Sequence, residues 1–412
     1  MKASSLPLSG IRVVDLSSAV VGPYATQVLA DYGADVIKVE ERSGDVIRWI
    51  SGRSPGPGMS GKFMHMNRNK RSVSLDLKQA EGREALLRLV DTADVFLHNM
   101  RPAAADRLGL GPADLAGRRP ALVYCAVVGF GSGGRYAGRP AYDSILQGGT
   151  GLASLFAAAG GPPRYVPYVV VDRTAGLMVA NALLSALFAR ERDGAGRVVE
   201  VPMFESYAAL LLSEHLYGHS FDPPTGPLGD SRLLDANARP VPTRDGHVCI
   251  TTNTDRQVHA LFLALGRPDL AADPRFADAR TRIDHIAEFF TLRAELLAGH
   301  DTAEITALLL AHDIPCMPCH TLESLLADPH LQDVGLVEFA EHPTQGRIRQ
   351  IRPTVSMTGF EPSVRLPAPH IGQHTDDVLA ALGYTMQQRA ALFAGGAAHT
   401  DGQAPISNRE VP

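Results

Sequence analysis

Cysteine is scarce in this sequence, and long apolar runs are missing. Four cysteines in 412 residues are too few for a disulfide framework, so we expect a reduced, cytoplasmic protein. No apolar run reaches the ~18 residues that a membrane-spanning helix needs, and the first residues lack the apolar core of a signal peptide. A net charge of −5 argues against a general nucleic-acid or membrane-surface binder.

Several common chemical motifs are also missing. The sequence has no G-x-x-x-x-G-K-[ST] phosphate loop, no G-x-S-x-G nucleophile elbow and no H-E-x-x-H metal motif. Cys316, Cys319 and His320 have the spacing of a metal or redox motif. However, one proline precedes this motif, another interrupts it, and the sequence has no second closely spaced cysteine pair. We therefore expect no metal site. Residues 129–134 match G-x-G-x-x-G without a following helix, which favours a mobile loop over a dinucleotide site.

Strands and helices alternate regularly along the first half of the chain. Residues 10–16 and 34–40 are typical of strands, and 23–32 between them of a helix. The same rhythm continues over about two hundred residues and predicts a doubly wound α/β domain. Residues 43–61, rich in Gly, Pro and Ser, are expected to form a long surface loop. Because the chain exceeds one typical core, we expect a second, smaller α+β domain after the Pro- and Gly-rich stretch 221–242.

Within residues 164–176, one carboxylate lies at the junction of a predicted strand and a predicted helix. An apolar run suited to a buried strand ends at Asp172, and a long helix rich in Ala and Leu follows at once. Asp172 could cap that helix, because Asp accepts hydrogen bonds from the free amides of a first turn. It could also be a nucleophile at the carboxyl edge of a sheet, where open α/β folds bind ligands. In either role the helix N-terminus is expected to favour its ionised form.

Basic residues recur just beyond the predicted strands. They are Arg42, Arg68, Lys70, Arg71, Lys78, Arg101 and Arg107. Each alone is typical of a solvated rim. Their repeated placement beside strand-to-helix turns suits a ligand with several phosphates, such as coenzyme A or a nucleotide.

Ordered blocks along nearly the whole chain resemble the family III CoA-transferases, which include formyl-CoA and carnitine CoA-transferases and a 2-methylacyl-CoA racemase branch. The blocks are residues 7–16, 22–27, 29–40, 67–72, 107–111, 172–176, 314–316 and 372–376. The resemblance implies a large Rossmann-like domain built from both chain ends, a small domain between them and two subunits interlocked as a homodimer. The implied divisions are 1–220 for the large domain, 221–245 for a linker or lid, 246–325 for the small domain, 326–395 for the return segment and 396–412 for a loose tail.

The resemblance also implies site residues and substrates. Asp172 matches the nucleophile of the transferases, and the substrates would be an acyl-CoA and a carboxylic acid, with no tightly bound cofactor. Arg164 and Arg173 are additions near the nucleophile that could hold a second carboxylate or form surface pairs. The positions implied to contact CoA are Val20, Val21, Arg42, Leu75, Asp76, Leu77, Lys78, Asn99, Met100, Arg101, Arg107, Pro140, Ala141, Tyr142 and Asp143.

Departures from the family pattern narrow the range of expected substrates and reaction types. Formyl-CoA transferases carry Gln where this chain has Val20, and a glycine run where it has residues 226–232, so oxalate and formate are not expected. The racemase branch needs a histidine near residues 113–116, and none is there to act opposite Asp143. We therefore expect a CoA-transferase, with succinyl-CoA among the candidate donors. A racemase-like isomerase and a non-catalytic CoA-binding protein are the alternatives.

The implied mechanism is covalent. Asp172 would attack the donor thioester to form a mixed anhydride, and CoA thiolate would convert this to an enzyme thioester. Backbone amides at 173–174 or in the loop 129–134 are the expected oxyanion donors.

Overall fold

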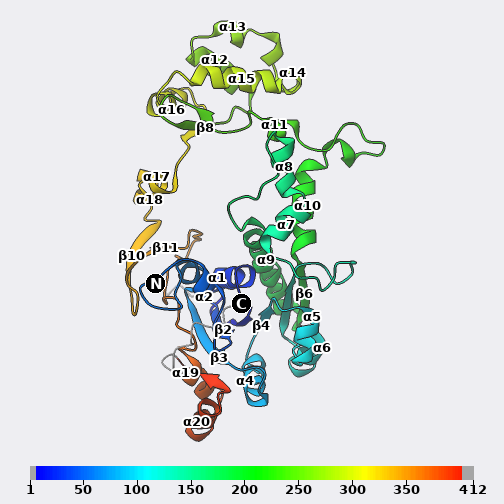
Figure 1. The fold of residues 1–412 in the computed structure, drawn as a ribbon, viewed down its shortest axis with the longest axis vertical. Coiled ribbons are helices and arrows are strands. Elements are labelled where there is room, and N and C mark those ends of the chain that lie inside the picture. The colour runs from blue at the N-terminus through cyan, green and yellow to red at the C-terminus, as the bar shows by residue number, and fades with distance from the viewer. Residues whose placement is uncertain (1–5, 401–412) are drawn as a thin grey trace. The chain divides into compact units, whose positions relative to one another are not determined.

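A computed structural model describes residues 6–400 of the chain (Figure 1). The chain forms two compact units. The first holds the residues up to Leu146, Pro167–Tyr207 and those from Gln332 onward. The second holds Gln147–Val166 and Ala208–Leu331. Residues 147–166 and 208–220 therefore group with the second unit, whereas the sequence placed them in the large domain, because they contact that unit more extensively.

A seven-stranded sheet forms the centre of the first unit, in the order β12-β3-β2-β1-β4-β5-β6. All neighbours pair in parallel except β12 with β3. Parallel strands covered by helices on both faces are buried along most of their length, and β1 and β2 accordingly bury even the charged residues Asp15 and Lys38 beside their valines and isoleucine. The strands are β1 Arg12–Leu16, β2 Asp35–Glu40, β3 Lys70–Leu75, β4 Val95–His98, β5 Val123–Val128, β6 Arg197–Pro202 and β12 Ala398–His399.

The helices between these strands have the amphipathic spacing that the sequence predicts. In α4 the buried Ala85, Leu86, Leu89 and Val90 form one apolar stripe. A hairpin of β10 (Val337–His342) and β11 (Gly346–Ile351) precedes the last helices. The helices along this part of the chain are α1 Val21–Asp31, α2 Ile47–Ile50, α3 Gly61–Asn67, α4 Ala80–Asp91, α5 Pro102–Arg107, α6 Pro112–Arg118, α7 Asp143–Gly149, α9 Val170–Asp193, α10 Met203–His215, α18 Pro329–Asp333, α19 Thr375–Ala381 and α20 Met386–Ala394.

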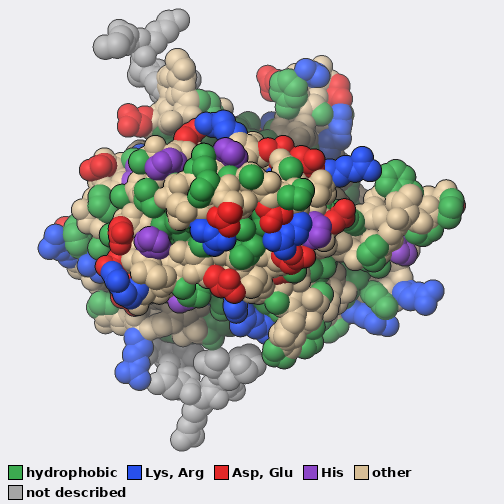
Figure 2. All heavy atoms as spheres, turned by 90° about the horizontal axis from the view of Figure 1, so that it is seen from above, with side chains coloured by type: hydrophobic (Ala, Val, Ile, Leu, Met, Phe, Trp, Pro, Cys, Tyr) green, Lys and Arg blue, Asp and Glu red, His purple; other side chains and the backbone are tan. Residues whose placement is uncertain are grey.

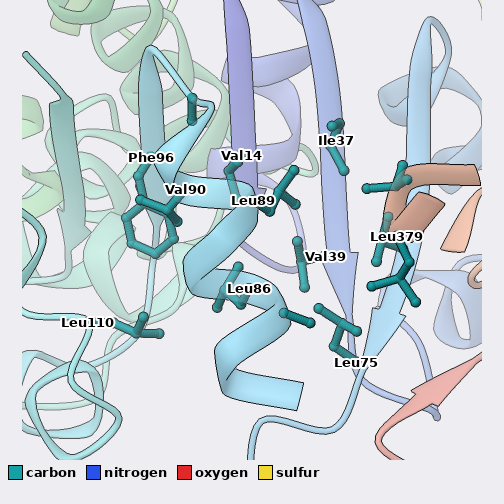
Figure 3. Close-up of a cluster of buried hydrophobic side chains, with 14 of the residues drawn as sticks. Val14, Ile37, Val39, Leu75, Leu86, Leu89, Val90, Phe96, Leu110 and Leu379 are labelled. Carbon is teal, nitrogen blue, oxygen red and sulfur yellow. The ribbon is translucent and has the colours of Figure 1, made fainter. Parts of the chain in front are cut away.

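The main core lies between one face of the sheet and α4 (Figure 3). Val14 and Ile37 project from the strands toward Leu89, and Leu379 joins them from α19. The C-terminal helices thus complete a core that begins with the first strand, so the two ends of the chain fold as one unit.

The second unit has its own core around a three-stranded antiparallel sheet, β7-β8-β9. Phe262, Phe276 and Phe289 meet in this core with ring centroids 5.6–6.0 Å apart. Its strands are β7 Val241–Pro242, β8 His247–Ile250 and β9 Cys316–Pro318; its helices are α8 Leu152–Ala158, α11 Ser231–Leu234, α12 Asp255–Ala264, α13 Pro268–Ala271, α14 Ala279–Asp284, α15 Ile286–Leu297, α16 Thr302–Ala311 and α17 Leu322–Leu326, with 3₁₀ turns at Tyr217–Ser220 and Pro274–Phe276. On the face drawn in Figure 2, charges of both signs are interspersed.

Helix α9 is the one described helix long and apolar enough to cross a membrane by length and composition alone. Its uncharged stretch is bounded by Arg173 and Arg190 and stays below the ~18 residues of the sequence expectation, which referred to an uninterrupted apolar run. Val171, Ala175, Val179, Leu183 and Leu187 recur every four residues and are buried, and the helix contacts α1, β5 and β6. This is the pattern of a helix that packs on a sheet.

Three local predictions were also wrong. No strand precedes Asp172, because residues 164–169 are irregular and α9 begins at Val170. The loop 43–61 contains α2, and Arg48 in it is buried on Glu40, which accepts two hydrogen bonds of 2.8 Å. The segment 396–412 is ordered at its start, where β12 pairs with Ser74 and Leu75; residues 401–412 lie outside the described range.

Candidate active site

Asp172 lies in the first turn of α9, two residues after its start, and is partly exposed. It does not cap the helix. The cap comes from Asp143, at the start of α7, whose Oδ1 accepts hydrogen bonds from the amides of Val171 (2.8 Å) and Asp172 (3.1 Å). A buried carboxylate from a distant segment thus fixes the helix start and places Asp172 beside a second negative charge.

The environment raises the pKa of Asp172 to about 7. Burial is the largest cause, the neighbouring Asp143 adds to it, and Arg173 and Lys62 act in the opposite direction. The helix N-terminus was expected to favour the ionised form of Asp172, but burial and Asp143 outweigh any such effect and raise the pKa. A carboxyl that titrates near neutral pH, next to another carboxyl, is typical of a functional site.

Several backbone amides at the start of α9 and in the loop 129–134, some of them among those expected to hold an oxyanion, are already occupied. Those of Val171 and Asp172 bind Asp143, and that of Arg173 donates to Val169 O at 3.0 Å. In the loop 129–134, Gly131 N donates to Glu205 (3.0 Å) and Ser132 N to Glu200 (3.0 Å). This loop is thus held by two carboxylates, and of the expected donors the amides of Arg173, Gly131 and Ser132 are already bonded.

Arg173, next to Asp172 in the chain, has a hydrogen-bond donor that no described residue uses. Its guanidinium lies over the ring of Tyr24, 4.4 Å from the centroid, and its Nε is buried with no hydrogen-bond partner in the described part of the chain. Gly176, one turn further on, allows this approach: a Cβ there would meet Val21 O at 2.9 Å and the Tyr24 ring at 3.0 Å. The spacing from Asp172 to Gly176 therefore has a structural reason, because the glycine lets α9 pack closely on α1.

The turn between β1 and α1 is tied down from two sides. Asn99 donates to Ser18 O (2.9 Å) and accepts from Ser18 N (3.0 Å), while Asp45 accepts from Ala19 N (2.9 Å). These bonds hold Ala19 at φ 65°, a region that costs a non-glycine residue energy. Strain held in place by surrounding contacts is common at ligand sites.

The residues expected to contact CoA follow the carboxyl ends of neighbouring parallel strands. They come after β3, β2, β1, β4 and β5, which are consecutive in the sheet, so the topology brings their segments to one edge. Arg42, Lys78, Arg101, Arg107, Pro140 and Tyr142 are exposed; Asp76, Leu77, Asn99, Met100 and Ala141 are partly exposed; Val20, Val21, Leu75 and Asp143 are buried. Because the side chains of these last four residues are buried, a ligand could contact only their backbone atoms in this structure.

Three of the seven basic residues are not part of a solvated or ligand-binding rim. Arg68 pairs with Asp31 (2.7 Å), Arg71 with Asp35 (2.6 Å) and Lys70 with Asp15 (3.2 Å). Arg42, Lys78, Arg101 and Arg107 are exposed and make no ion pair within residues 6–400. These four cations remain for the phosphates of a ligand.

Arg164 belongs to the second unit, where it is exposed and lies over Phe156, 4.6 Å from the ring centroid. In the part of the chain that the structure describes, no group of three His, Cys, Asp or Glu side chains is arranged to hold a metal ion.

Sequence reasoning missed Lys62, Tyr24 and Asp45, which are far from Asp172 along the chain. No spacing rule connects them to it, although Lys62 sits next to the block at 67–72.

Comparison with known proteins gives a consistent result. The profile of CoA-transferase family III matches residues 8–375. A probable fatty acyl-CoA transferase of Mycobacterium tuberculosis is 34% identical over 91% of this chain and 98% of its own. A succinate–glutarate CoA-transferase of Agrobacterium fabrum is 32% identical (91% and 96%), and a formyl-CoA:oxalate CoA-transferase of Escherichia coli is 31% identical (94% and 98%). A crystal structure of the M. tuberculosis protein superposes with a TM-score of 0.78 at 33% identity, covering 90% of this chain and 99% of that one.

Proposed function

Because the chain belongs to CoA-transferase family III, we propose that it moves CoA from an acyl-CoA donor to a carboxylic acid acceptor, with Asp172 as the nucleophile. The observation that carries the proposal is Asp172 itself. It is a partly exposed carboxyl whose pKa is raised to about 7 by burial and by the charge of Asp143, with Arg173 and Lys62 acting in the opposite direction. Such a group can be ionised at neutral pH and is destabilised enough in that form to react.

Four acyl transfers complete the proposed reaction. The Asp172 carboxylate attacks the donor thioester carbonyl and CoA leaves as thiolate, giving a mixed anhydride. The thiolate attacks the aspartyl carbonyl and releases the donor acid, leaving an aspartyl-CoA thioester. The acceptor carboxylate attacks this thioester, which forms a second mixed anhydride and frees the thiolate again. The thiolate then attacks the acceptor's acyl carbon, which yields the new acyl-CoA and restores Asp172.

We assign the developing oxyanions to side-chain donors, since the amides of Val171, Asp172 and Arg173 are occupied. Arg173 and Lys62 are the cations that act on Asp172. The phosphates of CoA would lie on the exposed Arg42, Lys78, Arg101 and Arg107 along the carboxyl edge of the sheet.

A homodimer is part of the proposal. Leu177 and Phe188 on α9 and Val198 on β6 are 47%, 61% and 61% exposed. Large apolar side chains this exposed on neighbouring elements are typical of a surface that a second subunit covers.

The direct test uses the purified protein with succinyl-CoA and a panel of acids that includes glutarate, because one relative is a succinate–glutarate CoA-transferase. We expect a new acyl-CoA to appear as free succinate is released. Binding of CoA with no transfer to any acid would contradict the proposal and favour a CoA-binding protein. Exchange of the α-proton of a 2-methylacyl-CoA in deuterated water, with no transfer, would favour the racemase alternative.

Asp143→Asn tests the electrostatic link to Asp172. The amide oxygen can still accept from the α9 amides, but the negative charge that raises the pKa of Asp172 is gone. We expect the acidic limb of the kcat/KM profile to move to lower pH, by up to about one unit. Asp143→Ala, which also removes the cap, should lower kcat in addition. An unchanged limb in Asp143→Asn would show that Asp143 does not act on the titrating group.

Arg173→Met tests the acceptor site. If its free Nε binds the second carboxylate of a dicarboxylic acid, KM for glutarate should rise by at least about tenfold, as for the loss of a charged hydrogen bond. KM for a monocarboxylate should change little, and Arg173→Lys should restore part of the affinity. Any effect of Arg173 on the pKa of Asp172 is common to both acids and cancels in the ratio. An equal rise in KM for both acids would contradict this role.

A further inference from the structure

The second unit contains a cavity of ≈ 560 Å³. It is open to solvent on one side and is lined by β8 and the residues after it, by residues of and after α11, and by residues of α14 and α15. Its volume is in the range of small-molecule sites. Every lining residue belongs to this unit, so the cavity is a property of that unit alone.

A buried arginine without an acidic partner lines this cavity. Arg293 on α15 is 5% exposed, and its Nε has no hydrogen-bond partner among residues 6–400. Its only hydrogen bond to the described residues is a long one, 3.5 Å from Nη1 to Ile250 O. The guanidinium lies over the Phe290 ring, 4.5 Å from the centroid. Burial lowers the pKa of Arg293 to about 10, which still leaves it protonated at neutral pH.

An unpaired buried charge is unfavourable, so its retention needs a reason. The other arginines of the cavity differ in this respect: Arg282 pairs with Asp255 (3.0 Å) and Arg232 with Asp230 (2.7 Å), while Arg239 is exposed. The buried wall therefore presents one uncompensated positive charge. The hydroxyl of Thr252, also on the wall, is a second buried polar group without a partner.

The remaining lining is largely apolar and includes Leu233, Ile283, Ile286 and Phe290, of which Phe290 lies against the guanidinium. A ligand that matches this wall carries one negative charge, a hydrogen-bonding group and an apolar body. We propose that the cavity binds a small monocarboxylic acid, with its carboxylate on Arg293 and Thr252 and its apolar part against α14 and α15. The inference does not rest on the chemistry of Asp172, because it concerns binding and is measured without CoA.

Calorimetric titration of the full-length protein with hexanoate is the test, with hexanamide and inorganic phosphate as comparison probes. We expect saturable binding of hexanoate, and hexanamide to bind at least about tenfold more weakly because it lacks the charge. Arg293→Met should lose this binding, and Thr252→Val should weaken it by a smaller factor. Arg256→Met is the matched control, since Arg256 is an exposed arginine of the same unit paired with Asp313, and it should bind hexanoate normally.

Two further readouts keep the cavity separate from the Asp172 site and from a role in folding. The binding that Arg293→Met loses should persist in Arg173→Met. Hexanoate should raise the Tm of the wild type but not of Arg293→Met, whose Tm without ligand should be equal or higher because an unpaired charge is gone. The proposal is overturned if hexanoate does not saturate, if Arg293→Met binds it normally, if phosphate binds more tightly, or if Arg293→Met changes the oligomeric state instead, which would assign the cavity to a protein carboxylate.

Discussion

Asp172→Ala and Asp172→Asn should lower CoA transfer by at least about three orders of magnitude, since each removes the nucleophile of a covalent route. Asn is close to isosteric with the ionised carboxyl and keeps the α9 turn intact. Wild-type enzyme incubated with acyl-CoA and hydroxylamine should carry a hydroxamate on the peptide that contains Asp172, as mass spectrometry can detect. The variants should carry none.

The same variants separate catalysis from folding. The pKa of Asp172 is about 7 in the folded protein and 3.8 as its ordinary value, because burial disfavours the ionised form. Above pH 7 the wild type therefore has an ionised carboxylate in a partly desolvated position. Ionisation therefore disfavours the folded state as pH rises between these two values. Asp172→Asn should have a Tm at least equal to that of the wild type at pH 8, and the difference should shrink toward pH 5. Appreciable transfer by Asp172→Ala, or a hydroxamate on the Asp143 peptide instead, would contradict the assignment.

Lys70→Met should be the most destabilising single change near the sheet. Lys70 is fully buried and donates to Pro23 O (2.8 Å), Thr26 Oγ1 (2.8 Å) and Asn67 Oδ1 (2.9 Å), besides pairing with Asp15 at 3.2 Å. Although burial by itself raises the pKa of Asp15, Lys70 and Lys38 lower it overall, so Asp15 is ionised in the core. Removing Lys70 leaves that charge poorly compensated, which costs about 3–5 kcal/mol.

Thermal unfolding would show this as a fall in Tm of about 6–20 °C. Arg88→Met is the matched control, because the Arg88–Glu84 pair lies on the surface of α4 and its loss should leave Tm nearly unchanged. Adding Asp15→Asn to Lys70→Met should recover part of the loss, since the unpaired charge is then gone. If Lys70→Met unfolds at the same temperature as Arg88→Met, the buried pair does not hold the sheet together.

The parts of the fold that depend on local periodicity could be predicted. Alternating apolar runs and amphipathic segments correctly indicated β1, α1 and β2, and the family resemblance was confirmed. Period 2 and period 3.6 are readable only where neighbours in the chain share an environment. The apolar residues before Asp172 satisfied that pattern and still form no strand, because no sheet edge is there to pair with them.

The features that depend on distant partners could not be predicted. The cap on α9 comes from Asp143, 28 residues before Val171, and only the folded chain reveals that it meets those amides. Likewise Arg68, Lys70 and Arg71 look like ligand cations along the sequence, but their carboxylate partners lie 37, 55 and 36 residues away. Whether a charged residue belongs to a binding site or to an ion pair can be decided only when its partner is known. This is why the prediction that Arg68, Lys70 and Arg71 bind a ligand failed. The role of Asp172 as the nucleophile remains a prediction.

The outer edge of β3 has a consequence for how the chain matures on the ribosome. Ser72 N donates to His374 Nδ1 and Ser74 N to Thr375 Oγ1, partners that are synthesised 302 and 301 residues later. At about 5–20 residues per second, the edge waits roughly 15–60 s for them. During that interval the outer edge of β3, whose other edge pairs with β2, is open to other nascent chains. Translation speed and chaperone access, rather than the stability of the finished fold, should therefore govern how much soluble protein a cell obtains.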